Sequence, residues 1–290
     1  LFITGMIGLP TFVGLWPWLY HDTVARLIAY IRFITVDHWK IGQWYFGAAY
    51  MPPPWHFPFV TLVAVTPLAI TILAIASIIR GVFALRSALP AQRDQGAQVA
   101  LWSFGVLVPL LALTTGRTMV YDNERLFMPS FLFVAALAGI GLDGAGRALR
   151  RALERRVPAR FTTPAVVLVC AALFAPHLII AAHMYPHLLS YYSETVGGLR
   201  GATRLGLETT YWCETYAQAL PYINAHAPSG AVVWVEDWSH DVLLTYQFIG
   251  RLRPDVRVAL APGAGSLFSR YGLEGTPADM TDADYVIVTY

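Results

Sequence analysis

The sequence contains little charge for its length. Of its 290 residues, 13% are Asp, Glu, Lys or Arg, whereas 56% are hydrophobic. Soluble domains carry about 25% charged residues. Half that fraction leaves too little polar surface to cover a globule of this size, so we expect a lipid bilayer to be part of the solvent. The net charge of +2 is too small to indicate a nucleic-acid partner.

Common site motifs are also scarce. The two cysteines, Cys170 and Cys213, lack the C-x-x-C spacing of a metal site and are expected to be unpaired thiols. Neither G-x-G-x-x-G nor a P-loop follows any predicted strand, so nucleotide binding is not indicated. The chain begins at Leu1 within an apolar stretch and shows no basic signal-peptide start. We therefore expect an internal fragment, with catalytic residues upstream of Leu1.

Five uncharged stretches are long enough to cross the bilayer, which takes about 20 helical residues. The predicted fold class is a polytopic α-helical membrane protein, with a transmembrane domain over residues 1–185 and a C-terminal extracytoplasmic α/β domain. The predicted spans cover residues 1–20, 57–79, 97–114, 126–142 and 162–184.

Basic residues are distributed unevenly between the loops that join these spans. Loops 80–97 and 143–161 hold nine of them, against five in loops 21–57 and 115–125. Because basic loops tend to stay in the cytoplasm, loops 21–57 and 115–125 and the tail after residue 185 are predicted outside the cytoplasmic membrane. Binding of anionic lipid is the lesser interpretation of the basic loops.

The C-terminal region, 186–290, alternates strand and helix patterns. The runs 231–237, 256–260 and 285–290 are typical of buried strands, and residues 214–226 and 241–249 of helices. Such alternation predicts a small parallel sheet. The Gly-rich passage before it, 191–206, is interpreted as turns.

Aromatic and histidine residues crowd the loop 21–57. Residues 23–35 have the pattern of an amphipathic helix in the membrane interface. His38 and His56 bracket the aromatic part, where each is either a base or phosphate partner or an interfacial packing residue. His177, His183 and His187 lie near the end of the last span, and a metal site there is a minor alternative because Pro186 interrupts the helix.

Charged residues cluster before the fourth span, in the segment 116–133. Charges at a membrane boundary are costly unless they are paired or face a polar cavity, so this cluster is a candidate site. Arginine offers a planar fork of donors that suits phosphate oxygens, and nearby carboxylates could bind a sugar hydroxyl or a divalent metal. The alternative is a solvated loop with internal ion pairs. The charged members are Arg117, Asp122, Glu124 and Arg125.

Several segments resemble one family of membrane enzymes. WPWLYHD (16–22), the stretch from HWKIGQWYFG to MPPPWHFPFV (38–60) and TPL (66–68) are similar to the later part of bacterial GT-C glycosyltransferases, which depend on polyprenyl phosphate. YDNERLFMPSFLFVAALAGIGL (121–142) resembles an outer-loop element of that family. YYSETVGGLRGATRLGLETTYWCE (191–214) resembles the passage that joins its last helix to the extracytoplasmic domain.

The resemblance implies a reaction and a division of roles. A sugar would move from a polyprenyl-phosphate donor to a protein, lipid or glycan acceptor outside the cytoplasmic membrane. Arg117 and Arg125 would bind the donor phosphate and stabilise its charge as the glycosidic bond breaks. The substrate pocket would include His38, His56, Tyr121, Asp122, Asn123 and Glu124.

Other roles stay open. The catalytic residues are unknown, since the acidic loop of the family precedes Leu1, and no metal ligand is assigned although a divalent metal is one candidate cofactor. A transporter is one alternative, but it would place ionisable groups at the membrane midplane. A non-catalytic subunit for polysaccharide assembly or export is the other.

Overall fold

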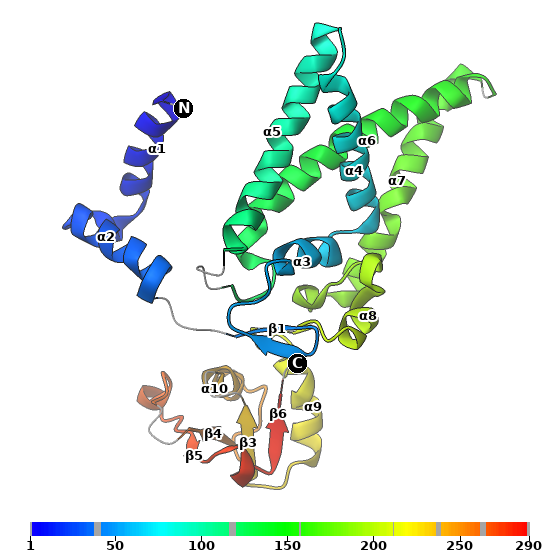
Figure 1. Cartoon of the computed structure of the whole chain (residues 1–290). Helices are drawn as coiled ribbons and strands as arrows, with labels where there is room; N and C mark the ends of the chain where they lie inside the picture. Colours follow the sequence, from blue (N-terminus) through cyan, green and yellow to red (C-terminus); the bar gives the residue numbers. More distant parts are fainter. Residues whose placement is uncertain are drawn as a thin grey trace. The chain divides into compact units, whose positions relative to one another are not determined.

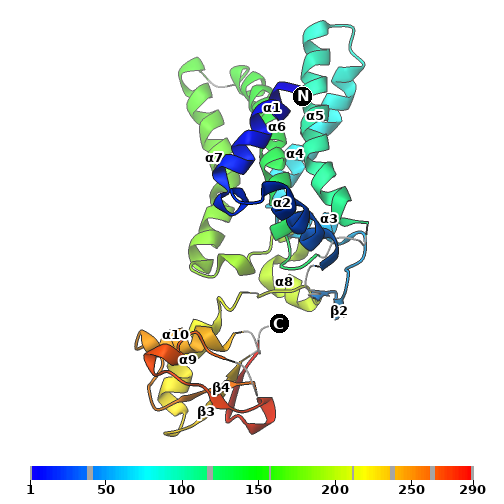
Figure 2. The ribbon, with the colours of Figure 1, turned by 90° about the vertical axis from the view of Figure 1, so that its left-hand side faces the viewer.

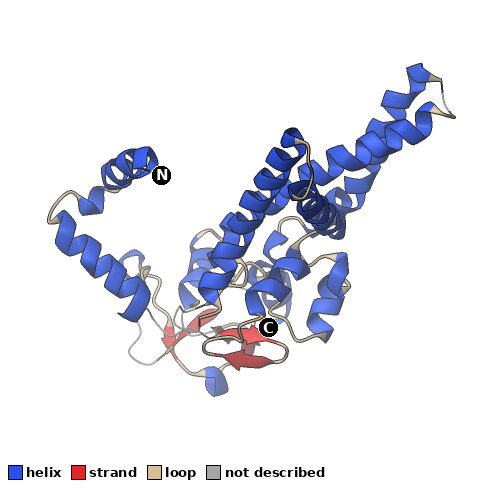
Figure 3. Cartoon of the chain, turned by 45° about the horizontal axis from the view of Figure 1, so that its top comes forward, coloured by secondary structure: helices blue, strands red, loops and turns tan. Residues whose placement is uncertain are grey.

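A computed structural model describes residues 2–37, 42–115, 120–156, 158–210, 212–235, 239–261 and 265–288. The chain divides into two compact units, Leu1–Val166 and Val167–Tyr290. The described residues are mostly helical, and their strands form one hairpin in the first unit and one small sheet in the second (Figures 1 and 3).

The first helix of the chain is shorter than the predicted span 1–20. Helix α1 covers Phe2–Leu15, about 21 Å at the rise of an α-helix, whereas the hydrocarbon core is about 30 Å thick. It ends there because Pro17 begins a 3₁₀ turn, η1 (Pro17–Leu19).

An amphipathic helix follows near the predicted range 23–35. Helix α2 covers Thr23–Arg32 and continues as the π-helical turn η2 (Phe33–Asp37). Val24, Ile28 and Ile31 are exposed at spacings of four and three, so they share one uncovered apolar face.

The predicted span 57–79 is divided into two helices. The chain is extended at Thr66 because a residue that precedes proline is pushed out of the helical region, and Pro67 has no N–H to continue the ladder. The second of these helices continues beyond residue 79. The two helices are α3 (Phe57–Val65) and α4 (Leu68–Leu85).

Helices α4, α5 and α6 pack against one another, and we call these three helices the bundle (Figures 1 and 2). A Cβ on Gly141 would overlap the carbonyl oxygen of Leu73, so the absence of a side chain lets the backbones of α6 and α4 approach closely. Helix α5 covers Pro90–Leu113; the 3₁₀ turn η3 (Arg125–Phe127) leads into α6 (Met128–Glu154).

Four helical segments among the described residues are long and apolar enough to cross a membrane. Helix α7 (Ala159–Met184) supplies the last of them and runs across the boundary between the two units. The four segments are Leu68–Leu85, Pro90–Leu113, Arg125–Glu154 and Arg160–Met184.

The second unit contains a parallel sheet of four strands in the order β5-β4-β3-β6. Val233 pairs with both Val258 and Tyr285, so β3 is central and can be apolar on both faces. This agrees with the predicted parallel pairing, and the two-residue β5 was not predicted. The strands are β3 (Val232–Val235), β4 (Arg257–Leu260), β5 (Thr276–Pro277) and β6 (Tyr285–Ile287).

Two helices pack with this sheet around a common core. Leu220 and Ile223 of α9 and Leu243 and Leu244 of α10 are buried in one cluster with Val233 and Val235 of β3. The Gly-rich passage contains a short helix, α8, rather than turns alone. The unit's helices after α7 are η4 (Leu188–Ser190), η5 (Glu194–Val196), α8 (Gly198–Arg204), α9 (Tyr216–His226), α10 (His240–Phe248), η6 (Ser269–Tyr271) and η7 (Met280–Asp282).

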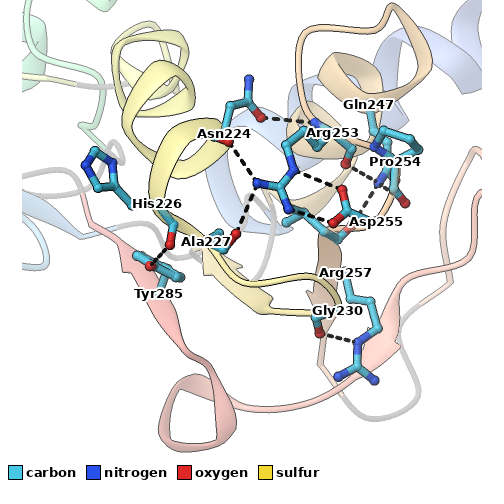
Figure 4. Close-up of polar contacts among 11 residues, drawn as sticks. Asn224, His226, Ala227, Gly230, Gln247, Arg253, Pro254, Asp255, Arg257 and Tyr285 are labelled. Carbon is cyan, nitrogen blue, oxygen red and sulfur yellow. Dashed lines mark hydrogen bonds and ion pairs between the residues drawn. The ribbon is translucent and has the colours of Figure 1, made fainter.

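One arginine network ties the loop before β4 to the end of α9 (Figure 4). Arg253 donates from Nε and Nη2 to the two carboxylate oxygens of Asp255, at 2.9 and 2.6 Å, and from Nη1 to the carbonyls of Asn224 and Ala227. The hydrogen bonds from Arg253 lower the pKa of Asp255 to about 2. Since every group here has an internal partner, we interpret the network as structural.

Candidate functional site

A small hairpin precedes the bundle and lies in the aromatic loop. Strands β1 (Gln43–Tyr45) and β2 (Ala48–Tyr50) pair antiparallel around Phe46 and Gly47. Both turn residues have positive φ, 48° and 78°, which is the backbone of a type I′ turn. Gln43 and Tyr45 point to the same face of β1, about 7 Å apart along the strand.

Gln43 joins this hairpin to the segment before α6. Its Oε1 accepts from the backbone N–H of Asn123 at 3.1 Å, and its Nε2 donates to the Asn123 Oδ1 at 3.3 Å. Both side chains are buried, at 0% and 4% exposure. Buried amides need such partners, so this pair fixes the position of residues 80 apart in sequence.

The segment that Gln43 holds has an unusual backbone. Asp122 and Asn123 are consecutive non-glycine residues at positive φ, 55° and 49°. Asp and Asn tolerate this region better than other residues, but each such conformation costs on the order of 1–3 kcal/mol and needs support from its surroundings. The buried pair of Gln43 and Asn123 supplies that support, so the surrounding structure holds the turn in this conformation.

The turn brings two of the predicted charged residues together. Arg125 donates from Nη1 to Asp122 Oδ2 at 2.8 Å, with side-chain exposures of 46% and 20%. Phe127, two residues on, is fully buried and anchors the start of α6. The Arg125 guanidinium is therefore held beside the Asp122 carboxylate, just before the apolar helix α6 begins.

Tyr45, which points to the same face of β1 as Gln43, contacts His56. Its hydroxyl lies 2.9 Å from the Nδ1 of His56. Burial first, and Tyr50 second, raises the pKa of Tyr45 to about 12, so the hydroxyl keeps its proton. In the tautomer in which Tyr45 donates to Nδ1, the His56 ring carries its proton on Nε2, and that nitrogen can donate to a ligand.

The predicted site residues separate into three groups. Asp122, Asn123 and Arg125 form the built turn, and His56 joins the hairpin through Tyr45. Tyr121 and Glu124 are half-buried in the same turn. His38 and Arg117 lie outside the described residues.

Searches of family models, curated proteins and solved structures found no match to this chain. A function must therefore be inferred from its residues and their geometry.

No metal cluster is present in the part of the chain that the structure describes. Helix α7 ends at Met184, before Pro186, so His183 and His187 do not share a helical face. His183 instead contacts the Ile179 carbonyl through Nδ1, at 2.8 Å.

Sequence reasoning missed a polar cluster in the second unit. The Nδ1 of His177 lies 3.0 Å from Glu194 Oε1, which is ion-pair distance without hydrogen-bond alignment. Burial first, and Glu194 second, raises the pKa of nearby Tyr191. The sequence places His177 near the end of the last predicted span, but its partner Glu194 is 17 residues away, beyond the end of the helix, and no periodicity links the two.

Proposed function

We propose that this chain is part of a membrane glycosyltransferase that moves a sugar from a polyprenyl-phosphate donor to an acceptor outside the cytoplasmic membrane. One observation carries the proposal: Arg125 is positioned at the start of an apolar, membrane-length helix by a strained turn. Backbone strain of this kind persists where surrounding structure maintains it, and such positions concentrate at functional sites.

Chain direction supports the placement of the site. Helices α4, α5 and α6 alternate in direction, so the hairpin and the Asp122–Arg125 turn meet at one end of the bundle. Residues 86–89, which follow α4, and residues 155–156, which follow α6, lie at the other end and include basic side chains. The positive-inside tendency then favours an outer location for the hairpin end, where lipid-linked sugars are used.

The chemistry of the turn fits a lipid phosphate. Arginine binds phosphate oxygens through charge-assisted hydrogen bonds, and it cannot lose its charge at physiological pH. When the bond between the sugar C1 and the phosphate oxygen breaks, the electron pair stays on that oxygen and negative charge grows there. A fixed guanidinium beside the oxygen stabilises that charge without reorganisation.

His56 supports the same role from the hairpin. In the tautomer in which Tyr45 donates to Nδ1, the ring offers an Nε2–H donor. We assign His56 to hold an oxygen of the donor head group. The base that takes the proton of the acceptor hydroxyl is not assigned to any of these residues.

Binding of a short-chain polyprenyl phosphate to the purified chain in detergent tests this proposal. Arg125→Gln should weaken binding about tenfold, the loss expected when one charge-assisted hydrogen bond is removed. Asp122→Asn removes the same ion pair but leaves the guanidinium, so binding should be retained or tightened.

The two substitutions are expected to change lipid binding in opposite directions. If the Asp122–Arg125 ion pair were only structural, either substitution would change binding equally. Arg93→Gln, in the first turn of α5, is the charge-matched control and should bind like wild type. If Arg125→Gln also binds like wild type, Arg125 has no phosphate role and the proposal fails.

One observation favours a second function, a non-catalytic subunit of polysaccharide assembly or export. Asp122 already neutralises Arg125, and a structural turn needs no ligand. Equal loss of binding in Asp122→Asn and Arg125→Gln, or no binding at all, would favour this alternative.

A further inference from the structure

The far end of the bundle contains a polar pocket that the proposed function does not use. It has a volume of about 470 Å³ and lies between α4, α5 and α6. Fifteen residues of α6 separate Met128, next to the Asp122–Arg125 turn, from Asp143 in the pocket wall, about 22 Å along the helix. The two sites are therefore distinct.

The pocket lies where the apolar parts of the helices end. Asp143 directly follows the uncharged stretch 126–142, and Arg80 is the first charged residue after the stretch 57–79. Charged groups at this depth are costly unless they are paired or face a polar cavity. Here they line one.

The positive charge of the pocket is incompletely neutralised. Arg147 pairs with Asp143, one turn earlier on α6. For Arg80, no ion pair is found among the residues that the structure describes. Two guanidinium groups and one carboxylate leave a net charge of +1 in the pocket.

The position of Arg80 depends on a glycine. A Cβ on Gly144 would overlap the Nη1 of Arg80, so the guanidinium of α4 lies directly on the bare backbone of α6. That contact positions the guanidinium of Arg80, which is otherwise exposed, at the wall of the pocket.

Neutral polar groups complete the lining. Gln92, Gln95 and Gln98 come from α5 and offer amide donors. The Ser77 hydroxyl of α4 is buried and, within the described residues, has no hydrogen-bond partner. Buried hydroxyls are rarely left unsatisfied, so this one indicates a missing acceptor.

We infer that this pocket binds a phosphate group, carried by an anionic phospholipid head or supplied as free phosphate. A guanidinium, amide donors and an unsatisfied hydroxyl are donors suited to phosphate oxygens, and the volume is that of a small-ligand site. Basic pockets between membrane helices at the cytoplasmic end are places where anionic head groups bind, and residues 86–89 and 155–156, which include basic side chains, flank this end.

Lipid titration of the full chain, followed by native mass spectrometry, tests the inference. The probes are phosphatidylglycerol, which is anionic, phosphatidylcholine, which has no net charge, and inorganic phosphate. Wild type should prefer phosphatidylglycerol to phosphatidylcholine. Arg80→Gln should bind the preferred anion about tenfold more weakly, as expected for one lost charge-assisted hydrogen bond.

Two matched controls separate the pocket from charge and helix effects. Arg150→Gln removes a guanidinium of α6 that pairs with Glu154 outside the pocket, and it should bind like wild type. Gly144→Ala keeps all charges but displaces the Arg80 guanidinium, so it should also weaken binding. Gly139→Ala, whose added Cβ meets nothing within 4 Å, should not.

Each outcome of the phosphate arm has a defined meaning. If excess inorganic phosphate displaces phosphatidylglycerol, the site accepts the free anion; if it does not, the site is specific for the lipid head. Both results support a phosphate site. If wild type binds neither phosphatidylglycerol nor inorganic phosphate, or if Arg80→Gln and Gly144→Ala both bind like wild type, the inference is overturned.

Discussion

The two ends of the bundle differ in how their polar groups are paired. At the hairpin end, the buried amides of Gln43 and Asn123 satisfy each other, and Arg125 has Asp122. At the pocket end, the Ser77 hydroxyl has no partner among the described residues, and the polar lining surrounds a cavity. Internal pairing produces a rigid framework, whereas incomplete pairing leaves a place for a ligand.

The largest expected effect comes from breaking both ends at once through the helix packing that they share. Gly141→Ala would place a methyl group on the Leu73 carbonyl of α4, and overpacking of this kind typically costs about 1–3 kcal/mol. We expect a lower midpoint of thermal unfolding in detergent, with loss of lipid binding at both ends. Gly139→Ala is the control, and an equal midpoint in the two variants would contradict the close approach of α4 and α6.

An effect of comparable size should be confined to the hairpin end. Gln43→Ala removes the two hydrogen bonds that Gln43 makes with the buried Asn123, at a cost of about 1–3 kcal/mol. Hydrogen exchange at residues 120–127 should accelerate. Gln95→Ala, an exposed glutamine of the pocket, should leave stability within about 0.5 kcal/mol. Similar losses of stability in Gln43→Ala and Gln95→Ala would contradict the proposed difference between the two ends.

The smallest effect concerns pH and should also arise at the hairpin end. The folded pKa of Tyr45, about 12, exceeds its ordinary value of 10.0. A raised pKa stabilises the fold fully below pH 10, and this contribution is lost as pH rises from 10 to 12. Tyr45→Phe should therefore show a smaller decline in stability over that range than wild type. An unchanged decline would show that Tyr45 is not the titrating group.

Much of the fold could be predicted because its signals are local. The runs that became β3, β4 and β6 are continuous and apolar, as expected for strands buried in a parallel sheet. Helices of membrane length can likewise be predicted from long uncharged stretches. The helix break at Pro67 was missed because apolar composition continues across it, although the proline itself was visible.

The candidate site was only partly predictable, for a different reason. Asp122 and Arg125 are three residues apart, so their proximity could be anticipated from the cluster of charges. Gln43 is uncharged and 80 residues from Asn123, and no periodicity links them. The hairpin could not be predicted either. Each strand has only three residues, and Phe46, which is not a typical turn residue, occupies a turn position with positive φ.

The long separation between Gln43 and Asn123 has a consequence for the order of folding. The strand that carries Gln43 is synthesised before α4 and α5, whereas its partner follows them. Closing so long a loop is entropically costly until the intervening helices have folded back on one another. The strained turn therefore forms late, and a chain whose helices have packed incorrectly would never acquire it.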